Sequence, residues 1–185
     1  MPSYNNFPLL HNKLLNYLLD YRQSKRQDFT FGLRKMNNKN RLEQGYWFQG
    51  DATYILIGFT DRGDSDNKTR QLGFGIEPDT TGQPNCHICI VFGAEKDQRI
   101  RSFYESVIAR LSGYKREKPN KPYRFFKRYP KDQDPFKCLD DFLANDFRTI
   151  YNMSISQGVA SELWVSEERF EEDLNRIKGF QKSDL

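Results

Sequence analysis

Two short clusters of this sequence contain residue types that could bind a metal ion. Cys86-His87-Ile88-Cys89 has the cysteine spacing of a zinc knuckle. A regular strand, however, points Cys86 and Cys89 to opposite faces, and no second C-x-x-C or H-x-x-x-H pair exists to complete a tetrahedral site. We therefore interpret the cysteines as buried small hydrophobic residues and His87 as a surface residue.

The second cluster is Asp66-Asn67-Lys68, which matches the short D-x-K pattern of metal-dependent nucleases. It falls in a polar loop, whereas nucleases of this class place these residues on a strand, so a divalent-metal nuclease is kept only as an alternative. His11 and His87, expected on a helix and a strand, give little support to a Ser-His or Cys-His pair. The phosphate-binding loop G-x-x-x-x-G-K-[ST] is absent from the sequence. We expect no catalytic residue, metal or cofactor in this chain.

Length and composition favour one domain with an aromatic core. The chain has 185 residues, of which 37% are hydrophobic and 15% are aromatic, enough to fill a single core. No run of about 18 apolar residues is present, and the first residues lack the pattern of a signal peptide. Three cysteines form no disulfide framework. These features predict a cytoplasmic protein that makes no contact with a membrane.

The charge is concentrated rather than spread evenly. The net charge is +4, yet nine basic residues and a single acid, Glu117, lie between Arg110 and Lys131. The part of the chain after Asp140 is acidic instead. This asymmetry suits an anionic partner, with nucleic acid the commonest candidate. The alternative is that these side chains are simply the solvated surface of an exposed loop and strand.

Apolar residues recur at helical spacing in several segments. The first covers about the first 20 residues, and the second runs from Glu95 to Leu111, with Gly113 placed to form a left-handed cap. A third helix is expected over Phe136 to Ile150. Ser166 is placed to cap a last helix whose first turn is acidic.

Alternating or continuous apolar runs predict the strands of a sheet. They cover residues 29–33, 45–49, 53–60, 72–76, 86–93 and 123–129, the last as an edge strand. Gly50-Asp51 is expected to form a tight turn, and residues 115–122 are too rich in proline and charge for regular structure. Gly73 and Gly75 leave one face of their strand as bare backbone, which indicates the close approach of a packed helix.

The order of these elements predicts the fold class. Because the strands are grouped together instead of alternating with helices, we expect an α+β domain. Its core is an antiparallel sheet of five or six strands, flanked by the N-terminal helix and three later helices.

Five segments together resemble a known family: YWFQG (46–50), YILIGF (54–59), D-x-DNKTR (64–70), LGFGI (72–76) and CLDDFLANDFRTI (138–150). They are similar to the N-terminal domain that precedes the motor in McrB-like AAA+ proteins of modification-dependent restriction systems, over about Phe29 to Ile177. The resemblance implies that residues 1–185 form one domain, either the N-terminal module of a longer restriction protein or a stand-alone relative. It also implies recognition of DNA, possibly modified DNA, and association with an AAA+ motor and a nuclease subunit.

The first functional hypothesis is therefore a DNA-binding recognition module. Lysine and arginine would hold phosphates while an aromatic side chain stacks on an exposed or flipped base. The candidate DNA-binding residues are Lys68, Arg70, Tyr114, Lys115, Arg116, Lys118, Lys121, Tyr123, Arg124, Lys127 and Arg128.

The second hypothesis is a protein-interaction domain that docks a motor or nuclease subunit. In that case the acidic C-terminal region and the sheet edge would form the contact, and the basic segment would bind an acidic protein rather than DNA.

Overall fold

The structure is a computed structural model that describes residues 6–61 and 71–181. In chain order its elements are α1 (Phe7–Ser24), the 3₁₀ turn η1 (Asn38–Asn40), β1 (Gln49–Gly50), β2 (Ile55–Gly58), β3 (Gln71–Pro78), β4 (Pro84–Val91), α2 (Gln98–Arg110), β5 (Lys115–Arg116), β6 (Arg124–Arg128), α3 (Pro135–Phe142), the π-helical segment η2 (Leu143–Phe147), α4 (Arg148–Ser156), α5 (Ala160–Leu163) and α6 (Glu167–Gln181). The predicted α+β class, with an antiparallel sheet and an N-terminal helix, is confirmed.

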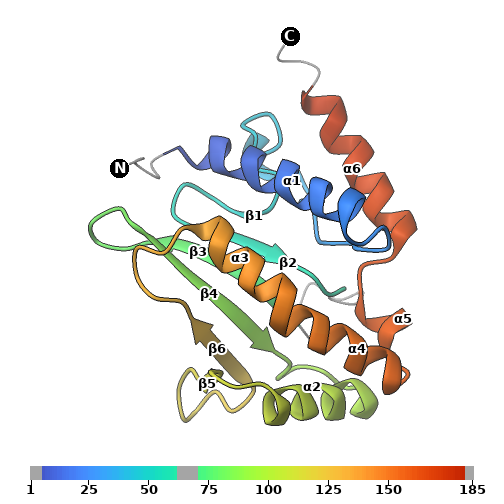
Figure 1. The fold of residues 1–185 in the computed structure, drawn as a ribbon. Coiled ribbons are helices and arrows are strands. Elements are labelled where there is room, and N and C mark those ends of the chain that lie inside the picture. The colour runs from blue at the N-terminus through green and yellow to red at the C-terminus, as the bar shows by residue number, and fades with distance from the viewer. Residues whose placement is uncertain (1–5, 62–70, 182–185) are drawn as a thin grey trace.

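Within the described residues, the strands form one sheet in the order β1-β2-β3-β4-β6-β5 (Figure 1). Every neighbouring pair is antiparallel. The prediction that residues 123–129 form an edge strand is wrong, because β6 has β4 on one side and β5 on the other. The edge is β5, which lies in a segment predicted to be irregular.

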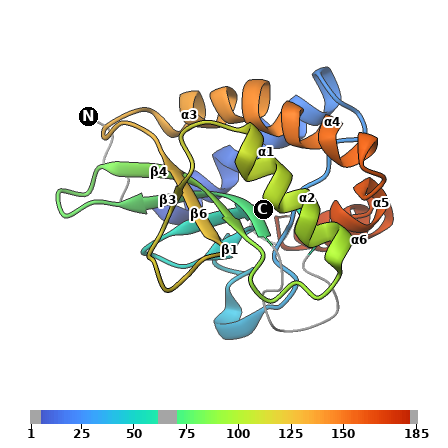
Figure 2. The same ribbon diagram turned by 90° about the horizontal axis from the view of Figure 1, so that it is seen from below.

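Helices α1, α3 and α4 lie on one side of the sheet (Figure 2). The interior between these layers is aromatic, as the composition predicted. Phe29 lies 5.3 Å from Phe147 and 6.1 Å from Phe59, measured between ring centroids, and all three side chains are buried. Contacts of this geometry add to the free energy gained from burying the rings.

Two of the predicted strands differ from the structure. Residues 29–33 are not a strand: Phe29, Phe31 and Leu33 are buried as expected, but the segment reaches the sheet only where Gly32 N–H donates to Gly58 O at 2.6 Å.

The strand predicted over residues 45–49 is shorter in the structure, where β1 contains only Gln49 and Gly50. The reason is Arg34, whose guanidinium donates to the carbonyls of Tyr46, Phe48 and Gly50 at 2.6–2.8 Å. A side chain here takes the carbonyls that a further strand would otherwise use. The expected turn at Gly50-Asp51 lies slightly later, where Asp51 N–H donates to Tyr54 O.

The helices agree more closely with the sequence. Ser166 Oγ accepts the Arg169 N–H at 3.3 Å, so the predicted cap of the last helix is confirmed. Gly113 has the expected positive φ of +86°, but Leu111, the residue that caps α2, already has extended backbone, so Gly113 lies beyond the cap. The third helix is longer than expected, because α3 continues through η2 into α4. The short helix α5 was not predicted.

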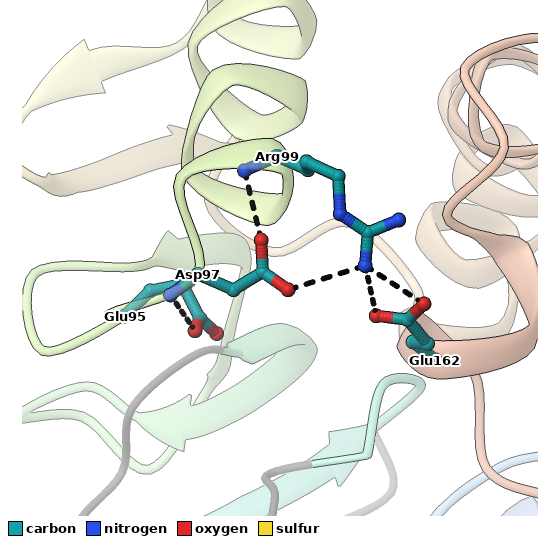
Figure 3. Close-up of polar contacts among 4 residues, drawn as sticks. All are labelled: Glu95, Asp97, Arg99 and Glu162. Carbon is teal, nitrogen blue, oxygen red and sulfur yellow. Dashed lines mark hydrogen bonds and ion pairs between the residues drawn. The ribbon is translucent and has the colours of Figure 1, made fainter.

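An exposed ion pair joins α2 to α5 (Figure 3). Arg99 donates to both carboxylate oxygens of Glu162 at 2.8 and 2.9 Å, and Asp97 caps α2 by accepting the Arg99 N–H. Glu95 in turn accepts the backbone N–H of Asp97. Since the pair is exposed, it orients α5 more than it stabilises the fold.

Candidate nucleic-acid interface

One face of the sheet carries polar and aromatic side chains instead of the apolar core. Directly paired residues of antiparallel strands point to the same face. Two rows therefore cross this open face, which we define by its members Leu56, Gly75, His87 and Arg128 in one row and Gly58, Gly73, Cys89, Phe126 and Lys115 in the next. The helices α1, α3 and α4 cover the opposite face, where Ile57, Phe74 and Ile88 are buried.

The open face contains a hollow of about 330 Å³. Its lining includes Tyr54, Leu56, Gln71, Gly75, Glu77, His87, Cys89, Val91, Arg124 and Phe126. These side chains come from β2, β3, β4 and β6 and from the residue before β2, so the hollow exists only once the sheet has assembled.

Gly75 of β3 lines this hollow, and Gly73 lies beside it on the same face. A Cβ on Gly75 would lie 2.4 Å from Nε2 of His87, and one on Gly73 would lie 2.9 Å from Cδ1 of Leu56. The expectation that a helix packs against these glycines is therefore wrong, because the close neighbours are side chains of the adjoining strands.

His87 is buried rather than at the surface, which corrects the sequence interpretation: only 5% of the residue is exposed. Burial lowers the pKa of its imidazole, and the charge of Arg128 lowers it further, while Glu77 opposes the change. Its Nδ1 has no hydrogen-bond partner among the residues that the structure describes. The ring is therefore a neutral polar group, placed 5.3 Å from the ring of Phe126.

Phe126 is half-buried on the open face with an arginine on each side. The guanidinium of Arg124 lies 5.9 Å from its ring centroid and that of Arg128 lies 5.5 Å away. Lys115 is paired directly opposite it on β5. This arrangement offers an aromatic surface for a base and cations for the phosphates on either side of it.

The turn that connects β5 to β6 extends the basic surface. Lys115, Arg116 and Lys118 are exposed. Glu117 is the acid of this segment, and it binds Arg124 at 3.2 Å and Lys121 at 3.7 Å. Arg124 and Lys121 are thus partly neutralised, whereas Lys115, Arg116 and Lys118 form no ion pair with another residue that the structure describes.

Two candidate residues, Tyr114 and Lys127, lie on the helix-covered side instead. The Tyr114 hydroxyl and the Lys127 ammonium both donate to Oδ2 of Asp146, at 2.8 and 2.9 Å. Burial and the Asp146 carboxylate raise the pKa of Tyr114. These contacts fix β6 and the start of β5 to η2 and leave neither polar group directed to the open face.

Tyr123 is also used internally, since its ring packs 5.3 Å from Phe92 and lies 4.8 Å below the guanidinium of Arg101. The remaining candidates, Lys68 and Arg70, lie outside the described residues, as does Asp66 of the nuclease pattern. The structure thus brings Lys115, Arg124 and Arg128 together on one face.

Sequence reasoning missed the contribution of β2, β3 and β4 to this site. Leu56, Glu77 and His87 lie 28 or more residues before Lys115, the nearest basic candidate that shares their face. The alternation of glycine in β3 marks the correct face, but the pairing of β4 with β6 is needed to join it to the basic segment.

Two other properties concern metals and membranes. Among the described residues, no group of three or more His, Cys, Asp or Glu side chains is arranged to hold a metal ion. Within the same residues, no helix is both long enough and apolar enough to span a membrane. Cys86 and Cys89 point to opposite faces, as predicted: Cys86 pairs with Ile76 of the core face, and Cys89 with Gly73 of the open face.

Comparison with known proteins gives no match to any family model, curated protein or solved structure.

Proposed function

We propose that this chain is a DNA-binding recognition module, of the kind that precedes the motor in McrB-like restriction proteins, without catalytic activity of its own. The observation that carries the proposal is the position of Phe126 on the open face, between Arg124 and Arg128 and beside the hollow. An aromatic ring flanked by cations suits a base and its neighbouring phosphates better than it suits an acidic protein, because only the base gains from stacking.

The exposed cations and the aromatic ring would contact different parts of the DNA. Lys115, Lys118 and Arg128 would contact phosphates, which supplies affinity without sequence information. Arg116 pairs with Phe125 and points to the other face of the sheet. Phe126 would stack on a base that has left the duplex stack. The hollow beside it, lined by Gln71, Glu77 and His87, offers hydrogen-bonding groups to such a base.

The test measures binding by fluorescence anisotropy with labelled single-stranded, unmodified duplex and base-modified duplex DNA. We expect Phe126→Ala to weaken binding of single-stranded DNA about tenfold, since stacking contributes roughly 1–3 kcal/mol per base. Lys13→Ala and Lys137→Ala are matched controls, because both lysines are exposed on helices at the opposite side of the sheet. Binding that is undetectable at low salt, or that Phe126→Ala leaves unchanged, would reject the proposal.

A further inference from the structure

A second groove lies away from the open face, between helices. It has a volume of about 1020 Å³ and lies between α1 and the continuous helix formed by α3, η2 and α4. Figure 1 shows these helices in front of the sheet. Tyr17 and Tyr21 of α1 and Leu143 and Ala144 of η2 give the groove an apolar lining.

The charges that border this groove are sorted by sign along its length. Tyr17 contacts Phe136 near the start of α3, whereas Arg26, just after α1, stacks on Tyr151 of α4 at 3.5 Å. The two helices therefore run in the same direction. It follows that Asp20 and Asp140 border one end of the groove. Lys25, Arg26 and Arg148 border the other end, where the single acid of the lining, Asp28, pairs with Arg26 at 3.1 Å.

This sorting does not help to hold the two helices together. Elsewhere in the molecule, elements are joined by opposite charges, as in the pairs Arg22–Glu167 and Arg99–Glu162. Apart from the local pair Arg26–Asp28, acid faces acid and base faces base across the groove. None of the four residues Asp20, Asp140, Lys25 and Arg148 forms an ion pair with another described residue. The arrangement leaves both signs of charge available to a third element.

We propose that this groove binds an amphipathic α-helix of a second protein. Apolar residues of that helix would rest on Tyr17, Tyr21 and Leu143, its basic end would lie over Asp20 and Asp140, and its acidic end over Lys25 and Arg148. The helix rises about 12 Å over the eight steps from Asp140 to Arg148, which matches two turns with anchors at i, i+3 or i+4, and i+7.

Two alternative occupants fit the groove less well. Nucleic acid is disfavoured, because the acids Asp20, Asp28 and Asp140 offset the three basic residues of the lining and would repel phosphates. A purely apolar ligand leaves the sorted charges without a role. The inference goes beyond DNA binding, and the groove lies on the helix-covered side of the sheet, so the module can bind DNA and a protein helix at once.

The test uses displayed helical peptides of about 14 residues, or four turns, with apolar residues fixed at one face and the charged positions randomised. Selection on the wild-type protein should enrich peptides with basic residues at one end and acidic residues at the other. A synthetic enriched peptide should bind the Asp20→Lys/Asp140→Lys variant at least about tenfold more weakly, because like charges then meet. The same peptide with its charges reversed should prefer that variant.

Further variants separate the groove from general charge effects. Ala144 is exposed at the groove, so Ala144→Trp should block the peptide while leaving the circular dichroism spectrum and DNA affinity unchanged. Glu105→Lys/Glu172→Lys is the matched control, because both acids are exposed outside the groove, and it should not affect peptide binding. Failure to enrich any peptide, or enriched peptides that ignore both groove variants, would overturn the inference. So would a dimer that Ala144→Trp dissociates, because a second copy would then occupy the groove.

Discussion

Mild acid should destabilise this protein through His11, a completely buried imidazole on α1. Its Nδ1 accepts the backbone N–H of Phe48 at 3.1 Å, while its Nε2 has no hydrogen-bond partner among the described residues. Burial, assisted by the charge of Arg34, lowers the pKa of His11 from 6.5 to about 3. The fold therefore requires the neutral ring.

The size of the effect follows from the difference between the folded and unfolded states. In the unfolded chain His11 regains its ordinary pKa, so below pH 6.5 the unfolded state binds one proton more than the folded state. The free energy of unfolding then falls by up to about 1.4 kcal/mol per pH unit until the folded pKa is reached. Between pH 7 and pH 5 the loss amounts to about 2 kcal/mol. His87, whose pKa is also lowered by burial, acts in the same direction.

The assay is urea denaturation at pH 7 and pH 5 for the wild-type protein and for His11→Asn. The Asn Oδ1 can still accept the Phe48 N–H but does not titrate in this range. We expect the variant to be less stable at pH 7 and to lose less than half as much stability as the wild type on acidification. Since the chain has only two histidines, His87→Asn is the matched comparison. Equal losses in wild type and His11→Asn would refute the reasoning.

Three further predictions concern positions at which one atom or group has a clear role. Asp134→Ala removes the cap that accepts two N–H groups at the start of α3 and should cost about 1 kcal/mol in denaturation experiments. Gly75→Ala should destabilise the fold by about 2 kcal/mol, because the new methyl group meets the ring of His87. Gly58→Ala on the same face has free space for its methyl group and should leave the melting temperature unchanged. Asp146→Asn removes the nearer of the two carboxylates beside the partly buried ammonium of Lys127, which lies 2.9 Å from Asp146 and 3.9 Å from Asp141. It should cost about 2 kcal/mol of stability, and a smaller loss than for Asp134→Ala would contradict this.

Local patterns of the sequence were sufficient to predict those elements of the fold that depend on interactions between neighbouring residues. The apolar alternation of β3 and β4, the positive φ of Gly113, the cap at Ser166 and the amphipathic face of α2 all depend on residues close together in the chain. The fold class followed from the order of these elements.

The rest of the fold and of the candidate site depends on contacts between residues that are distant in the sequence. Arg34 replaces part of a predicted strand by binding carbonyls 12 to 16 residues away, and Asp146 binds Tyr114 and Lys127 across 32 and 19 residues. The burial of His87 depends on Gly75, its partner on the neighbouring strand. No local pattern contains this information. The sequence therefore identified the basic segment as a cluster of charge, but it could not show that its side chains divide between the open face and the helix-covered face of the sheet.

The central claim is that the open face binds DNA through its exposed cations, and a salt titration of affinity tests it most directly. Removing one cation that binds a phosphate should reduce the slope of log K against log salt by about 0.9 on duplex DNA. The account predicts that Lys115→Ala/Arg128→Ala lowers this slope by about 2, while Lys13→Ala/Lys137→Ala leaves it unchanged. Equal slopes for the two double variants, or no binding by the wild-type protein at low salt, would contradict it.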